Sequence, residues 1–339
     1  MCNIAGYTGT RPAAPILLEM LRRQELYDGN VSTGIATIHE GKIYSKKIVG
    51  TVDEFLQEFD LSEFPGTIGI AHTRPSGQKD AQAVQPEYNP DYTMALVTNG
   101  TKVTKYQSEW AKAAKMLADH GYDQEISCDD PTKVANSIKL RAWLVDYFMK
   151  QGDSIPKALA KSCDCVYTDN ITVMIHQDYP ESIFALRCTR PMNVILENGE
   201  VYMATTRFAF PAELKSEPTM LPLAHACEIQ KSGIRIFCDK MKMEPVSEMT
   251  PYTYAEGYKR FEAILKSDRA PLYFDELEFA VGREMRDLWP GDHTCIQHAR
   301  LVYDMLWQFE QEGRLKREMR VQERPGGILR RRWYFSLET

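Results

Sequence analysis

The first residues of the chain bring together two groups that could cooperate in catalysis, a thiol and an α-amino group. The sequence opens Met1-Cys2-Asn3-Ile4, and removal of Met1 would leave both groups on Cys2. An unperturbed thiol titrates near pH ~8.5 and an α-amino group near ~7.7–8.0, so a modest shift makes the amine a competent base for the thiol. A terminal amine that activates its own side chain is a known form of nucleophilic catalysis. The alternative is that Cys2 is an ordinary residue near an N-terminus.

Two later apolar segments end in polar residues. The segment Gly69–Arg74 reads GIAHTR and the segment Ala95–Gly100 reads ALVTNG, and each pattern predicts a strand. A planar guanidinium such as that of Arg74 can bind both oxygens of a carboxylate. The amide groups of Asn99 and Gly100 could stabilise an oxyanion. The ordinary alternatives are a surface ion pair for Arg74 and a common Asn-Gly turn.

Together with the opening residues, these segments resemble the glutaminase domain of class II, N-terminal-nucleophile glutamine amidotransferases. The resemblance runs from Cys2 to about residue 240 and is strongest to the domain that opens glucosamine-6-phosphate synthases. It implies an α+β chain whose first 240 residues adopt a four-layer αββα N-terminal-nucleophile hydrolase fold. It also implies an enzyme that hydrolyses the side-chain amide of glutamine, with Cys2 as nucleophile and with Asn99 and Gly100 forming the oxyanion hole.

The same resemblance assigns the substrate contacts. Arg74, with Thr73 beside it, would hold the α-carboxylate of glutamine. An aspartate at a helix start would hold the α-ammonium group; Asp130 matches best, and Asp129 is the second choice. Asp130 followed by Pro131 also fits an ordinary helix N-terminus, so the two roles stay open.

The sequence departs from the family pattern in three places. Asn3 replaces the glycine of Met-Cys-Gly, and the segment 28–32 (DGNVS) replaces Arg-Gly-Tyr-Asp-Ser. After Arg74 the chain has Pro75-Ser76-Gly77-Gln78 instead of Trp-Ala-Thr-His-Gly. An arginine near the nucleophile, a lid tryptophan and two substrate contacts are thereby lost. The alternative function is therefore a catalytically weak, glutamine-sensing regulatory protein.

Hydrophobic periodicity predicts the elements that must position these residues. Helices are expected over 14–24, 52–59, 106–120 and 130–150, a hairpin over 34–39 and 42–49, and strands over 67–72, 94–98, 171–175, 182–186, 194–196 and 201–204. Many strands with a few long helices favour layered packing, with sheets inside and helices outside.

The remaining chain is expected to form a linker (241–251) and a C-terminal module (252–339). Three predicted helices (254–267, 274–281, 294–312) and two strands (315–321, 328–336) resemble a winged helix. Between Arg314 and Arg332 there are eight basic and two acidic residues, so Arg330, Arg331 and Arg332 are candidates for nucleic-acid phosphates. The alternatives are a solvated hairpin or a packing unit. Because every candidate catalytic residue lies at or before Asp130, removal of residues 246–339 is expected to leave glutamine hydrolysis intact.

Composition sets the broad class of the protein. With 339 residues, 43% of them hydrophobic, and a formal net charge of −6, the chain can bury large cores and does not favour indiscriminate nucleic-acid binding. Eight scattered cysteines, no signal sequence and no apolar run long enough to span a membrane favour a cytoplasmic protein. No metal or cofactor is expected. The expected partners are glutamine, an ammonia-accepting subunit in place of the missing sugar-isomerase region, DNA through the C-terminal module, and a second copy of the chain, with no membrane.

Overall fold

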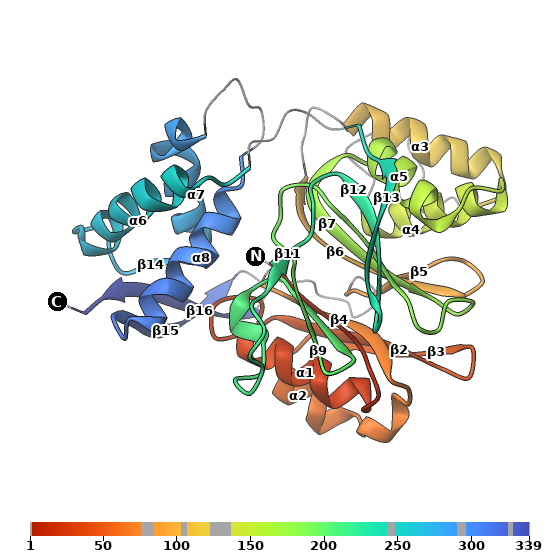
Figure 1. Cartoon of the computed structure of the whole chain (residues 1–339), viewed down its shortest axis with the longest axis horizontal. Helices are drawn as coiled ribbons and strands as arrows, with labels where there is room; N and C mark the ends of the chain where they lie inside the picture. Colours follow the sequence, from red (N-terminus) through yellow and green to blue (C-terminus); the bar gives the residue numbers. More distant parts are fainter. Residues whose placement is uncertain are drawn as a thin grey trace.

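Strand β1 (Asn3–Thr8), which directly follows Cys2, lies in the middle of the first of two antiparallel sheets (Figure 1). The computed structural model describes residues 2–75, 84–102, 107–122, 137–242, 248–289, 296–324 and 328–338. The strand order of this sheet is β11-β9-β10-β1-β4-β2-β3. The other strands are β2 (Ser32–His39), β3 (Lys42–Ile48), β4 (Ile68–Arg74), β9 (Asn193–Glu197), β10 (Glu200–Ala204) and β11 (Thr219–Met220).

The second sheet has the strand order β13-β12-β8-β7-β6-β5. Its longest pair is β6 with β7, which runs in register from Met94 opposite His176 to Lys102 opposite Thr168. The strands are β5 (Glu87–Tyr88), β6 (Met94–Lys102), β7 (Thr168–His176), β8 (Ile183–Arg187), β12 (His225–Gln230) and β13 (Gly233–Lys240).

An apolar layer joins the two sheets. Side chains alternate along a strand, so Ile4 of β1 points into this layer while Ala5 points to the opposite face. Ile4 belongs to one core cluster with Ile70 of β4, Val97 of β6 and Val173 of β7. The alternation therefore assigns each residue of β1 and β4 to one of two faces.

Helices cover the outer faces of both sheets. On the first sheet, α1 (Ala13–Gln24) buries Leu17 and Leu21, four residues apart on one helix face, and α2 (Val52–Glu58) lies beside it. On the second sheet, α3 (Gln107–Asp119), α4 (Ser137–Lys150) and α5 (Ile155–Cys165) share a core with β6, β7 and β8. Within the described ranges, no helix combines the length and apolar character needed to cross a membrane.

The C-terminal module has its own small sheet, with strand order β14-β16-β15. Its elements are α6 (Pro251–Lys266), β14 (Leu272–Tyr273), α7 (Phe274–Glu284), α8 (His298–Gln311), β15 (Leu315–Arg324) and β16 (Ile328–Leu337). Phe261, Leu277 and Leu306 lie in its core, and Tyr27 from the N-terminal part lies in the same cluster.

The predicted mixture of helices and antiparallel strands is confirmed, with three differences in detail. Strand β6 continues to Lys102, so Asn99 and Gly100 lie inside it, because β7 pairs with β6 along the whole of that length. Helix α5 and the β12–β13 hairpin were not predicted. The predicted helix start at Asp130 lies outside the described residues, and the boundaries 1–240, 241–251 and 252–339 stay predictions.

Candidate functional site

Cys2 is held at the end of a strand that is fixed on both edges. Asn3 lies opposite Thr73 of β4, and Ala5 lies opposite Ala204 of β10. The backbone N–H of Ile4 donates to the hydroxyl of Thr205 at 2.9 Å. Every residue of β1 is buried, whereas Cys2 itself is half-buried. A thiol next to a strand that is fixed on both edges is held in a defined orientation, which is what a nucleophile needs.

Asn99 connects the second sheet to this thiol-bearing residue. Its side chain is 2% exposed, and its Nδ2 donates to the backbone carbonyl oxygen of Cys2 at 2.7 Å. The amide has two N–H donors, and one of them makes this bond. The structure thus brings together the predicted nucleophile and one of the two predicted oxyanion donors, from strands 97 residues apart in the sequence.

Gly100 follows Asn99 inside β6, opposite Asn170 of β7. A Cβ at position 100 would lie 2.5 Å from the backbone oxygen of Asp169 and 2.6 Å from the Cβ of Asn170. The close approach of β7 therefore explains the glycine by itself. The oxyanion role of Gly100 stays a prediction.

Arg74 and Thr73 end strand β4 on opposite faces of the sheet. Because side chains alternate, Arg74 shares the face of Ile70, toward the second sheet. Burial raises the pKa of the Cys2 thiol, and the positive charges of Arg74 and Arg190 act in the opposite direction. Arg74 is thus close enough to Cys2 to influence its charge. Thr73 lies on the other face, where its hydroxyl accepts a hydrogen bond from Asn3.

Asn3, which stands where the related pattern has glycine, has a defined structural role. Its Nδ2 donates to the backbone oxygen of Asp28 at 2.5 Å and to the hydroxyl of Thr73 at 3.3 Å. Gly29 passes directly beside it with a φ of +98°, and a Cβ there would lie 2.4 Å from Asn3 Nδ2. The substituted residues Asn3 and Asp28, with Gly29 packed between Asn3 and Thr73, therefore form one interlocked turn next to Cys2.

Arg190 is a charged residue of this region that the sequence interpretation missed. Its side chain is 4% exposed, and it forms ion pairs with Asp169 at 3.2 Å and with Glu278 of α7 at 2.5 Å. Glu278 also lies 2.9 Å from His298 of α8. These partners are as much as 88 residues away in the chain, so no local motif marks them.

Asp129 and Asp130, the two candidates for binding the α-ammonium group of the substrate, lie outside the described residues.

The basic hairpin of the C-terminal module is largely engaged within the chain. Arg332 is 8% exposed, pairs with Asp275 at 3.3 Å and stacks over the ring of Tyr273 at 3.8 Å. Arg331 lies 3.7 Å from Glu54 of α2. Nothing is described of the side chain of Arg330. These contacts favour the packing alternative for Arg331 and Arg332 over phosphate binding.

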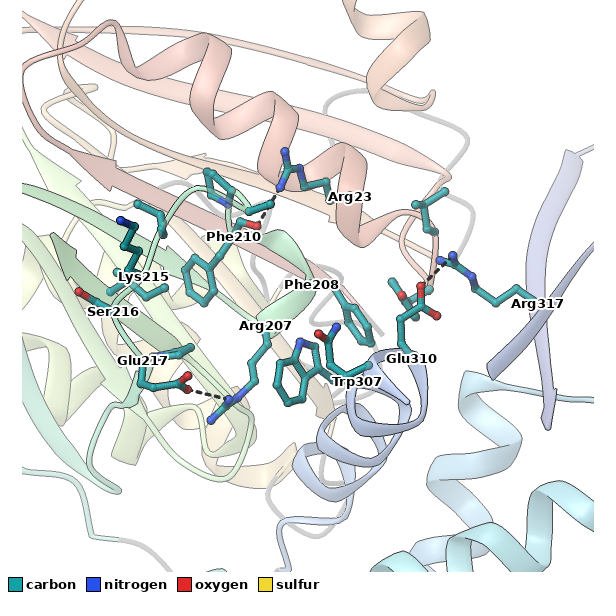
Figure 2. A pocket seen from close by; sticks show the side chains of 18 residues that line it. Arg23, Arg207, Phe208, Phe210, Lys215, Ser216, Glu217, Trp307, Glu310 and Arg317 are labelled. Atoms are coloured by element: carbon teal, nitrogen blue, oxygen red, sulfur yellow. Dashed lines mark hydrogen bonds and ion pairs between the residues drawn. The ribbon is translucent and has the colours of Figure 1, made fainter. Parts of the chain in front are cut away.

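A cavity of about 470 Å³ lies between the C-terminal module and the first sheet. Figure 2 shows Trp307 of α8 facing Arg207 and Phe208 from the segment after β10. Arg207 covers the Trp307 ring at 4.9 Å and pairs with Glu217 at 3.3 Å. The volume is sufficient for a small molecule, but most of its described cations already have acidic or backbone partners. Both parts of the chain line the cavity, so it lies at the interface between them.

Comparison with known proteins supports the predicted resemblance. Over 217 residues, 63% of this chain, the sequence is 35% identical to the glutamine–fructose-6-phosphate aminotransferase (isomerizing) of Caldanaerobacter subterraneus. The chain is thus similar in sequence to part of this aminotransferase. It is also 30% identical, over 214 residues, to the protein of the same name from Pyrococcus horikoshii. The chain spans about a third of the length of these curated relatives, 33% in both cases. No family model matches it.

Solved structures of amidotransferases share the fold. The glutamine phosphoribosylpyrophosphate amidotransferase of B. subtilis, solved with ADP and GMP, superposes with a TM-score of 0.58 at 17% identity, covering 78% of this chain and 58% of that one. A structure described as the allosteric regulatory enzyme of purine biosynthesis gives a TM-score of 0.59 at 17% identity, covering 78% and 57%. The sequence relatives are named as aminotransferases, and the fold neighbours as an amidotransferase and a regulatory enzyme, so the proteins that this chain resembles are enzymes.

Proposed function

We propose that this glutamine amidotransferase homologue hydrolyses the side-chain amide of glutamine to glutamate and ammonia, with Cys2 as the nucleophile. The observation that carries the proposal is the 2.7 Å hydrogen bond from Asn99 to the backbone oxygen of Cys2, which joins an amide donor to the residue that bears the thiol. Two sheets that share a core and carry helices on their outer faces support the four-layer αββα arrangement of N-terminal-nucleophile hydrolases.

The reaction begins with the α-amino group of a mature chain that starts at Cys2. The amine takes the thiol proton, and the sulfur attacks the side-chain carbonyl carbon of glutamine. Negative charge then develops on the carbonyl oxygen, where the second N–H of Asn99 supplies a donor; such a donor contributes about 3–4 kcal/mol. Collapse of the tetrahedral intermediate breaks the C–N bond, and the protonated amine returns its proton so that ammonia leaves. Water then hydrolyses the thioester to glutamate and regenerates the thiol.

A histidine base is the obvious alternative to the amine, and His72 of β4 is the buried histidine nearest in register to the β1 start, opposite Ile4. Burial and the neighbouring Arg74 lower its pKa to about 3. A base of such low pKa is poorly matched to neutral pH. This supports the α-amino group, whose ordinary pKa of about 7.7–8.0 is much better matched.

Substrate recognition in this proposal rests on Arg74 for the α-carboxylate and on Asp130 for the α-ammonium group. Arg74 stands on the nucleophile's face of the sheet and influences the Cys2 thiol electrostatically, as a clamp beside the reacting centre would. The ammonia acceptor would be a partner protein, as amidotransferases transfer ammonia to an acceptor.

For the C-terminal module, we propose a winged-helix-like unit that packs on the glutaminase part. The order α6, β14, α7, α8, β15, β16 supports this assignment, and the ion pairs of Arg331 and Arg332 support a packing role.

The test of the proposed function is glutamate and ammonia release by the purified chain, compared with Cys2→Ala and Cys2→Ser. Turnover by the unsubstituted chain that both substitutions abolish is the expected result. Glutamine binding without turnover, measured by calorimetry, would support the glutamine-sensing alternative. Absence of both binding and turnover would overturn the proposal.

A further inference from the structure

One side chain of the C-terminal module reaches the nucleophile strand. Tyr303 of α8 is 2% exposed, and its hydroxyl donates to Oδ1 of Asn3 at 3.4 Å. Its ring packs on Phe274 of α7, with the ring centres 4.3 Å apart. Figure 1 shows α8 beside the N-terminus of the chain. A residue 300 positions away is thus in contact with the neighbour of Cys2.

The receiving residue has little freedom to move. Asn3 is fully buried and donates its two amide hydrogens to Asp28 and Thr73, while its oxygen accepts from Tyr303. Three of the four hydrogen-bonding positions of this amide are thus occupied, and these three bonds hold the residue whose peptide Cys2 shares. Loss of one partner leaves the amide free to tilt.

The helix that carries Tyr303 is itself anchored to the second sheet. Nε2 of His298, at the start of α8, is 2.9 Å from the carboxylate of Glu278. Glu278 in turn pairs with the buried Arg190. The preceding residue, Gln297, accepts a hydrogen bond from Arg187 of β8. Because these anchors tie both α7 and α8 to the sheet that also supplies Asn99, the module is placed relative to both halves of the nucleophile site.

We propose that Tyr303 is a positioning residue for Cys2 and acts through Asn3, so that glutamine hydrolysis depends on the C-terminal module. This inference rests on the proposed function, in which Cys2 is the attacking group. The hydroxyl of Tyr303 bonds to Asn3, and its proposed effect is on the direction in which the sulfur of Cys2 points. It reverses the expectation from the sequence that residues 246–339 are dispensable for activity.

The test is a double-substitution cycle with Tyr303→Phe and Asn3→Ala in the full-length chain. Tyr303→Phe keeps the ring and removes only the hydroxyl; it is expected to lower kcat roughly threefold to tenfold with KM unchanged. If Tyr303 acts through Asn3, the double variant is no slower than Asn3→Ala alone. Multiplication of the two separate effects would overturn the proposal, as would an unchanged kcat in Tyr303→Phe.

A second readout does not depend on glutamine turnover. Mass spectrometry of the N-terminal peptide measures the rate at which iodoacetamide labels Cys2. This rate is expected to change by the same factor as kcat in Tyr303→Phe, in Asn3→Ala and in the double variant. The matched control is Tyr254→Phe, which removes another tyrosine hydroxyl of the module; this hydroxyl bonds to Asp304 at 2.8 Å instead of to Asn3. The control is expected to leave labelling and kcat unchanged; an equal effect there would show general loosening of the module and overturn the proposal. A labelling change in a chain without glutaminase activity would preserve the coupling and reject the proposed function instead.

Discussion

The buried ion pair between Arg190 and Glu278 is expected to be the strongest single link between the C-terminal module and the sheets. The perturbation is Glu278→Gln, which keeps the shape of the side chain and removes its charge. Arg190 is 4% exposed and Glu278 17% exposed at an N–O distance of 2.5 Å, so the substitution removes one of the acidic partners of a buried guanidinium, while Asp169 stays at 3.2 Å. Removing one partner of a buried pair costs about 3–5 kcal/mol, and we expect about 3 because glutamine still accepts a hydrogen bond.

Urea unfolding followed by tryptophan fluorescence measures this cost. With an m-value of about 3 kcal/mol/M, the midpoint of the transition falls by about 1 M. The matched control is Asp287→Asn, which breaks a surface pair in the same module: Arg260 and Asp287 are 36% and 60% exposed at 2.7 Å. A surface pair contributes at most about 1 kcal/mol, so its midpoint shift is about 0.3 M or less. Equal shifts in the two variants would refute the reasoning.

The pH dependence gives the same experiment a second check. Arg190 and His298 hold the pKa of Glu278 far below its usual range despite the opposing effect of burial. A carboxyl whose pKa is lower in the folded state than in the unfolded state adds stability that is fully present above the unfolded pKa of about 4.3. This contribution is lost as the pH falls toward the folded pKa. The difference in the free energy of unfolding between the unsubstituted chain and Glu278→Gln should therefore be constant from about pH 8 to 5. It should become smaller below about pH 4.3.

Four further outcomes are expected. Asn99→Ala should lower kcat about 100-fold to 1,000-fold, measured as glutamate release, because it removes a transition-state donor; an effect on KM alone would contradict the oxyanion role. Arg74→Ala should raise the KM for glutamine by roughly 30-fold or more, and Arg74→Lys should recover only part of it, because a point charge cannot bind both carboxylate oxygens; an unchanged KM would remove Arg74 from the site. Intact-mass measurement of active protein should find chains that begin at Cys2, and activity confined to chains that retain Met1 would exclude the amine base. Arg332→Ala should lower the melting temperature and leave electrophoretic DNA binding unchanged, since its guanidinium is buried against Asp275 and Tyr273; a loss of DNA binding without a loss of stability would restore the phosphate role.

Local chemistry made much of the fold predictable. The predicted hairpin about Glu40 and Gly41 is confirmed. In the structure both residues adopt positive φ angles, 48° and 70°, which that kind of tight turn requires. Alternation also predicted strands such as β7. The β13 strand was missed even though Ile234, Ile236 and Cys238 alternate, and its pairing partner β12 was missed with it.

The same distinction between local and distant contacts separates the site residues that the sequence predicted from those that it missed. Cys2, Arg74 and Asn99 were chosen because their flanking residues resemble a known pattern, and the contact between Asn99 and Cys2 fits that choice. Arg190 and Tyr303 carry no such pattern: one lies in a loop and the other on an ordinary amphipathic helix. Their importance arises only when residues about 100 and 300 positions apart are brought together by the packing of the module.

The central place of β1 in its sheet has a consequence for the order of events during synthesis. One edge of β1 pairs with β4, which ends at Arg74, but the other pairs with β10, which ends at Ala204. At a translation rate of about 5–20 residues per second, some 10–40 s pass before the last of these partners has left the ribosome's catalytic centre. Throughout that interval the N-terminal strand has an unpaired edge. Any processing that frees the amine of Cys2 thus has a period in which the chain end is not yet enclosed by β10 and the C-terminal module. Cys2 is among the first residues made and among the last to reach its final surroundings.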